Sequence, residues 1–146
     1  MEVTYRSLTI GDVVDVRAIE ELVFPAEAWS EPLIREELSS RWAHYIGAFL
    51  GEHMIGYGGI KGDDEGDLMT LAVKPEFRRL GLGRHLVKLL IEEGRAARMG
   101  QLFLEVRESN TPARALYQEL GFVPVGKIAN YYRDPAEDAI TMRIEL

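Results

Sequence analysis

Hydrophobic residues recurring every three or four positions predict four helices in this chain. The first spans residues 13–23 behind a Thr-x-x-Asp capping box, and the second runs from a Ser30 cap to about residue 38. The third, residues 82–98, carries leucines and isoleucine on one face and charged residues between them. The fourth begins after Asn110, a good N-cap, and ends at about residue 120.

Apolar runs and apolar–polar alternation predict seven strands. The first lies around Val3 and Tyr5, and the others cover residues 42–50, 54–60, 68–73, 101–107, 122–128 and 139–144. Residues 130–138 are expected to form a connecting loop. No repeat, low-complexity segment or linker interrupts this order, so the 146 residues are expected to form a single domain, residues 1–146.

The stretch from Asp67 to Lys88 joins the end of a buried strand to the start of the longest helix. Between them lies Arg-Arg-Leu-Gly-Leu-Gly, residues 78–83. Glycines let the backbone approach a ligand closely, and the first N–H groups of a helix have no internal acceptor. Strand, glycine turn and helix together therefore predict an anion cradle, with a phosphate as the expected guest. The alternative is a plain helix-start turn with two glycines.

The spacing of the glycines limits which phosphate ligand is expected. A dinucleotide-binding turn needs GxGxxG and a P-loop needs GxxxxGK(S/T), and neither pattern occurs in the chain. The formal net charge of −7 argues against nucleic acid as a direct partner. Basic residues gather around the glycine turn, which favours one local anion site on an acidic body; they are Lys74, Arg78, Arg79, Arg84, His85 and Lys88.

The absence of cysteine excludes disulfides, thiolate metal sites and a cysteine nucleophile, and it suits a reducing compartment. His44, His53 and His85 have no ligand spacing, so no metal is expected. The chain has no run of 18 apolar residues and no basic-then-apolar leader. Neither membrane insertion nor export is therefore expected, and the cytoplasm is the default compartment.

Two motifs resemble a known family. The RxxGxG pattern at residues 78–83 resembles the pyrophosphate loop of the GNAT N-acetyltransferases, whose backbone amides hold acetyl-coenzyme A. Residues 102–122, LFLEVRESNTPARALYQELGF, look like the ribosomal-protein-alanine N-acetyltransferases, the RimI branch of that superfamily. Asn-Tyr-Tyr at 130–132 and Glu-Asp-Ala at 137–139 are similar to further segments of the branch. The resemblance spans essentially the whole chain.

This resemblance implies an α+β GNAT fold, with a single mixed, mostly antiparallel sheet of about seven strands flanked by about four helices. It implies acetyl-coenzyme A as the acetyl donor, with the backbone of residues 71–73 pairing with the pantetheine arm like an added strand. An amide near Val73 is the implied oxyanion donor. The implied cofactor-binding residues are Leu71, Ala72, Val73, Arg79, Leu80, Gly81, Leu82, Gly83, Arg84 and Asn110.

Acetyl transfer to an amine needs a neutral amine, a polarised carbonyl and a proton for the departing thiolate. Glu105 stands inside the apolar run 102–106, which can desolvate it and raise its proton affinity, so it is the candidate base. The alternative for Glu105 is an exposed position on an edge strand. Tyr117 by its pattern alone is a half-buried core residue, whereas the resemblance implies a general acid aimed at the coenzyme sulfur.

The predicted function is direct transfer of acetyl to a protein N-terminus, with the N-terminal alanine of a small-subunit ribosomal protein as the best acceptor by resemblance. An α-amine has a pKa of roughly 7.7–8, far below roughly 10.4 for lysine, so it is the easier acceptor. The alternatives are a broader N-terminal acetyltransferase, a small-molecule amine acetyltransferase and a non-catalytic acyl-coenzyme A binding module. Glu105 and Tyr117 disfavour the last. The candidate walls of the acceptor site are Phe24, Trp29, Tyr131 and Tyr132.

One segment departs from the pattern of the branch. A Pro-Trp-Ser sequence usually follows the first helix there, whereas here Ala28 precedes Trp29-Ser30 and Pro25 lies further back, separated by three small or acidic residues. The segment from Phe24 to Trp29 is either a recognition loop or a packed corner. Because this loop flanks the acceptor site in the family, the acceptor follows less directly from the resemblance than the cofactor does. The pattern leaves the oligomeric state open.

Overall fold

Seven strands form one sheet in the computed structural model, which describes residues 2–146. Two short 3-10 turns, Ile10–Asp12 and Pro75–Phe77, precede the first and third helices. In chain order the elements are β1 (Thr4–Ser7), α1 (Val13–Val23), α2 (Glu31–Ser39), β2 (Ala43–Leu50), β3 (His53–Gly62), β4 (Gly66–Val73), α3 (Leu82–Ala96), β5 (Gln101–Arg107), α4 (Thr111–Glu119), β6 (Val123–Arg133) and β7 (Ala136–Glu145).

The sheet has the strand order β1-β2-β3-β4-β5-β7-β6. Every neighbouring pair is antiparallel except β4 and β5, which are parallel. The mixed, mostly antiparallel sheet with four helices that the sequence predicted is therefore confirmed.

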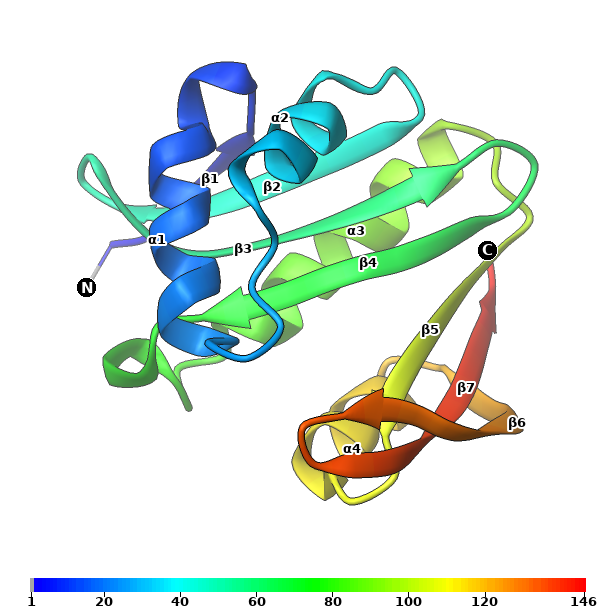
Figure 1. Cartoon of the computed structure of the whole chain (residues 1–146). Coiled ribbons are helices and arrows are strands. Elements are labelled where there is room, and N and C mark those ends of the chain that lie inside the picture. The colour runs from blue at the N-terminus through cyan, green and yellow to red at the C-terminus, as the bar shows by residue number, and fades with distance from the viewer. Residues whose placement is uncertain (1) are drawn as a thin grey trace.

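Helices cover both faces of the sheet, with α1 and α2 in front and α3 behind in Figure 1. The apolar side of α3, including Leu86 and Leu90, packs into one core cluster together with Tyr117 of α4. On the other face, Val16 and Ile19 of α1 pack with residues of α2, β2 and β3 in a second cluster. Each helix has its apolar residues on one side only, so each can cover only one face of the sheet. No helix in residues 2–146 is long and apolar enough to cross a membrane.

The pairing of β4 with β5 is very short. It joins only Gly66 with Leu102 and Asp67 with Phe103, although the two strands continue for six and four residues beyond that point. The strands then separate, and Figure 1 shows the resulting gap between them. The sheet is therefore open along one side of β4 and β5.

The C-terminal hairpin is longer than the sequence predicted. The expected loop over residues 130–138 is wrong, since β6 reaches Arg133 and β7 begins at Ala136. Asn130 adopts a positive φ of 54°, and the pairing of β6 with β7 shifts register between Ile128 and Tyr132. Residues typical of loops are thus absorbed as an irregularity within the strand. Tyr131 and Tyr132 consequently stand on a strand.

A buried carboxylate ties α1 to the sheet. Glu20 is 1% exposed, and its two oxygens accept hydrogen bonds from the Tyr57 hydroxyl of β3 and from the backbone N–H of Trp29 at 3.1 Å. Burial raises the pKa of Glu20, while these hydrogen bonds oppose that rise. The carboxylate therefore positions both α1 and the loop that follows it.

We predict that Glu20→Ala lowers the free energy of unfolding by roughly 2–4 kcal/mol, because it leaves the buried Tyr57 hydroxyl and the partly buried Trp29 N–H without their acceptor. Glu20→Gln should cost less, since an amide can still bond both groups. In wild type the raised pKa makes folding favour the protonated group, so stability from this group falls as pH rises above about 4.3. Denaturant unfolding at several pH values should therefore show Glu20→Gln improving relative to wild type from about pH 4 to pH 7. A constant difference would contradict the raised pKa.

Candidate active site

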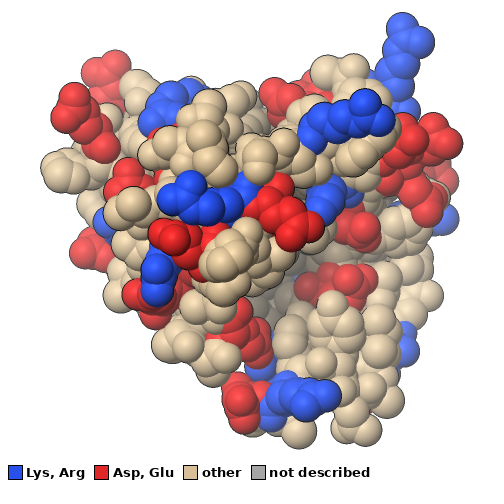
Figure 2. All heavy atoms as spheres, turned by 45° about the horizontal axis from the view of Figure 1, so that its top comes forward, with Lys and Arg blue, Asp and Glu red and all other residues tan. Residues whose placement is uncertain are grey.

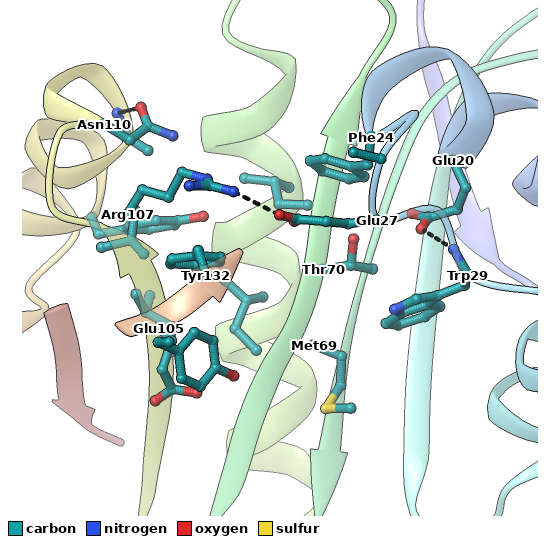
Figure 3. Close-up of a pocket in the computed structure, with 18 of the residues that line it drawn as sticks. Glu20, Phe24, Glu27, Trp29, Met69, Thr70, Glu105, Arg107, Asn110 and Tyr132 are labelled. Atoms are coloured by element: carbon teal, nitrogen blue, oxygen red, sulfur yellow. Dashed lines mark hydrogen bonds and ion pairs between the residues drawn. The ribbon is translucent and has the colours of Figure 1, made fainter. Parts of the chain in front are cut away.

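A cavity of about 720 Å³ lies where β4 and β5 separate. The α1–α2 loop forms one wall, β4 and β5 form the floor, and the start of α4 with the end of β6 forms the other wall (Figure 3). The structure brings together eight of the residues that the sequence singled out. They are Phe24, Trp29, Leu71, Glu105, Asn110, Tyr117, Tyr131 and Tyr132.

The remaining predicted cofactor residues do not line the cavity. Ala72 is buried in the core cluster on the α1–α2 face. The glycine turn lies just beyond β4, where a Cβ built on Gly83 would stand 3.8 Å from Leu71 and 3.9 Å from Val73. The start of α3 therefore borders the open side of β4. The other residues of this group are Arg79, Leu80, Gly81, Leu82 and Arg84, all before or within the first turn of α3.

Glu105 is half-buried on a strand whose neighbours face the other way. Leu104 and Val106 are buried in the core cluster on the α3 face, so strand alternation directs Glu105 to the α1–α2 face. Glu105 pairs with Thr141 of β7 on one side, whereas the other side of β5 faces the gap at this position, because β5 pairs with β4 only at Leu102 and Phe103. Burial raises the pKa of Glu105, and the nearby Asp67 carboxylate raises it further. The residue thus combines cavity access with increased basicity.

Tyr117 belongs to the opposite face. It is 8% exposed, lies in the same core cluster as α3, and packs edge-on against Phe122 with ring centres 5.7 Å apart. Burial, with a smaller effect of Tyr132, raises its pKa to about 12. The phenol is therefore protonated at neutral pH. The expectation of a core tyrosine is correct, and the same residue also lines the cavity.

Backbone N–H groups of β4 point into the gap. The N–H of Lys74 donates to the carbonyl of Ile55 at 2.9 Å, and alternation along an antiparallel ladder then directs the N–H groups of Leu71 and Val73 away from β3. The carbonyl of Val73 faces the same way and accepts a hydrogen bond from Arg78 at 3.2 Å. An extended ligand in the gap can pair with this edge as a strand would.

The start of α3 has the geometry of an anion site. Gly81 is its N-cap, with a φ of 79°, and the cap has no side-chain hydrogen bond. The N–H of His85 is bonded to the Gly81 carbonyl, so the N–H groups of the first turn have no partner within the helix. A Cβ on Gly81 would meet no atom within 4 Å. Arg79 precedes this turn and also has a positive φ, 65°.

Three cavity residues with defined contacts were missed by sequence reasoning. The signal for Glu20 was a carboxylate on the apolar side of α1, where the buried positions also include Val16 and Ile19. Glu27 and Arg107 form an ion pair across 80 residues at 2.6 Å, and no local pattern could have paired them. In residues 2–146, no group of three or more His, Cys, Asp or Glu side chains could hold a metal ion.

Comparison with known proteins agrees with this geometry. The model of the acetyltransferase (GNAT) family matches residues 13–122. The chain belongs to the GNAT acetyltransferase family. It is 36% identical to the N-alpha-acetyltransferase RimI of Mycobacterium tuberculosis, over 97% of this chain and 91% of that protein.

Solved GNAT structures have the same fold. The ribosomal-protein-S18-alanine N-acetyltransferase of Escherichia coli superposes with a TM-score of 0.91 at 33% identity, covering 99% of this chain and 94% of that one. A GNAT family acetyltransferase of Elizabethkingia anophelis with acetyl-CoA bound gives a TM-score of 0.82 at 23% identity, over 99% and 98% of the two chains. The chain is accordingly an N-acetyltransferase of the RimI type.

The residues of this GNAT chain fit acetyl-coenzyme A. The free N–H edge at Leu71 and Val73 suits the amide-bearing pantetheine arm, and the open helix start at Gly81 suits the pyrophosphate. Asn110, the N-cap of α4, accepts a hydrogen bond from the Ala113 N–H at 3.2 Å and lines the cavity. Backbone groups of this chain thus supply most of the expected contacts.

We predict that Gly81→Val weakens coenzyme A binding by at least about tenfold, because its side chain enters the space of the phosphate and disturbs charged hydrogen bonds. A positive φ costs a valine about 1–2 kcal/mol, so the fold should persist. Gly51→Val is the matched control, since Gly51 has a φ of 62°, equally open surroundings and no place in the cavity. Calorimetry with coenzyme A should separate the two variants. Equal affinity of both variants for coenzyme A would contradict the predicted anion site at the start of α3.

Proposed function

We propose that this GNAT enzyme moves acetyl from acetyl-coenzyme A directly to the α-amine of a protein N-terminus. The best acceptor is the N-terminal alanine of a small-subunit ribosomal protein in the cytoplasm. One observation carries the proposal: Glu105 reaches the gap in the sheet from the α1–α2 face, and Tyr117 lies on the α3–α4 side of the same gap. A base and an acid therefore flank the cavity from opposite faces.

The two groups suit opposite proton transfers. When bound, acetyl-coenzyme A supplies a thioester carbonyl. The N–H of Val73 points into the gap, where it would donate a hydrogen bond to that carbonyl oxygen. Glu105, made more basic by burial and by Asp67, accepts the proton that the amine loses. Tyr117, protonated at neutral pH, donates its proton to the departing sulfur.

The acceptor side favours a peptide chain. Phe24 and Trp29 line the cavity on the side of α1, and Tyr131 and Tyr132 line it from β6. Figure 2 shows Asp and Glu side chains interspersed with Lys and Arg on this view of the molecule, and the formal net charge of the chain is −7. An acidic body attracts basic polypeptides. The similarity to an enzyme named for the alanine of ribosomal protein S18 supports the same acceptor.

We predict that a peptide beginning with alanine is acetylated at its α-amine in preference to an internal lysine. The lysine needs a larger free-energy input to become neutral at pH 7, because its pKa is higher by about 2.5 units. Mass spectrometry with fragment ions should locate the acetyl group, using the same peptide blocked at its N-terminus as the control. Predominant acetylation of lysine would contradict the proposal that the acceptor is an N-terminal α-amine.

We predict that Glu105→Gln lowers the rate at neutral pH by roughly 10²- to 10⁴-fold, as is typical of general acid–base catalysis. Its defect should shrink at high pH, where the amine is already neutral. In wild type the base works in its ionised form, so the raised pKa places the acid limb of the pH–rate profile above about 4.3, the ordinary value for glutamate.

Tyr117→Phe should behave differently in the same experiment. It leaves the thiolate without a proton donor, so raising the pH should not restore its rate. Both variants should bind acetyl-coenzyme A as wild type does, which calorimetry checks. If both variants stayed within about twofold of wild type, the assigned proton transfers would be wrong.

A further inference from the structure

An ion pair crosses the cavity at its acceptor end. Glu27 lies in the α1–α2 loop on one wall, and its carboxylate bonds the Arg107 guanidinium of β5 at 2.6 Å (Figure 3). Among residues 2–146 it is the one side-chain hydrogen bond or ion pair that joins residues 24–29 to the opposite wall. The loop is thus held across the opening by a single polar contact.

Arg107 is the anchored partner of this pair. Its guanidinium also donates to the carbonyl of Pro135 at 2.9 Å, contacts Glu137 at 3.3 Å and lies 4.3 Å from the ring centre of Tyr132. Its side chain is 21% exposed, against 44% for Glu27. Arg107 therefore belongs to the rigid β5–β7 wall, and Glu27 is the contact that brings the loop to it.

Both ends of this loop are held by hydrogen bonds to Glu20 of α1. Trp29 donates its N–H to buried Glu20, and Phe24 donates its own N–H to the Glu20 carbonyl at 2.8 Å. Between these two fixed points lie Pro25, Ala26, Glu27 and Ala28. Glu27 therefore lies between Pro25 and Trp29, in the segment where this sequence departs from Pro-Trp-Ser.

We propose that Glu27 is a positioning and specificity-determining residue for the acceptor. Its ion pair with Arg107 sets the separation between the aromatic wall of Phe24 and Trp29 and the facing ring of Tyr132. The acceptor's first residue binds between these walls, and the donor end, built on β4 and α3, is independent of the pair. The inference rests on the proposed acetylation of a protein N-terminus.

The test compares KM for the peptide acceptor with Kd for acetyl-coenzyme A, since only the first should change. Glu27→Gln keeps the shape of the side chain but weakens a partly exposed charged bond, so KM for an alanine-initiated peptide should rise about three- to tenfold. We expect kcat within about twofold of wild type and an unchanged Kd for acetyl-coenzyme A, because neither proton-transfer group is touched. Hydrogen exchange of the amides in residues 24–29 should also become faster.

Glu21→Gln is the matched control. Glu21 stands on the preceding helix and makes an exposed ion pair with Arg17 at 3.0 Å, outside the cavity. An unchanged peptide KM in Glu27→Gln, or an equal rise in Glu21→Gln, overturns the proposal. If wild type acetylates only a small amine, the proposed function fails. The KM comparison is then made with that amine, where a rise supports the role of Glu27 and an unchanged value overturns it.

Discussion

The early end of pairing between β4 and β5 is the constraint on which the site depends. Hydrogen bonding stops after Asp67 and Phe103, so the N–H groups of Leu71 and Val73 face an opening in place of a neighbouring strand. Because the two strands are parallel, the chain must cross over between them, and α3 makes that crossover. Its first turn consequently lies at the end of β4, beside the opening. A backbone edge for an extended ligand and a helix start for an anion thus follow from one interrupted ladder.

Three glutamates line this opening, and their surroundings differ. Glu20 is closed off by the Trp29 N–H and the Tyr57 hydroxyl, which makes it part of the framework. The carboxylate of Glu27 forms an ion pair with Arg107. For Glu105 the causes of its raised pKa are burial and the neighbouring Asp67 alone, with no hydrogen bond opposing them. Of the three, Glu105 is therefore the one whose proton affinity is raised without a fixed partner, which is what a general base requires.

Local patterns were sufficient for several helix caps and strand bounds. The cap at Ser30, the cap at Asn110 and the bounds of β5 all lie where residue spacing predicted them, because each depends on neighbours in sequence. The prediction of a loop between β6 and β7 was wrong for the opposite reason. Asn130 tolerates a positive φ and is typical of a loop, but here it lies within β6, which pairs with β7. The Glu20–Tyr57 and Glu27–Arg107 contacts span 37 and 80 residues. Periodicity carries no information about such pairs, so the acceptor wall could be named only by its aromatic residues.

The proposed donor end of the cavity is built from backbone groups and the proposed acceptor end from side chains. This difference explains why the sequence pattern indicates the donor end more clearly than the acceptor end. The donor end uses backbone N–H groups and a glycine with positive φ, which many side-chain sequences can support provided the strand, turn and helix are kept. The proposed acceptor end uses side chains from residues 24–29 and from the end of β6. Family membership therefore carries the donor chemistry across distant relatives, whereas acceptor choice has to be read from contacts such as the one between Glu27 and Arg107. In this chain the two segments that bear the proposed acceptor walls, residues 24–29 and the end of β6, are thus separate from β4 and the first turn of α3, which bear the proposed donor contacts.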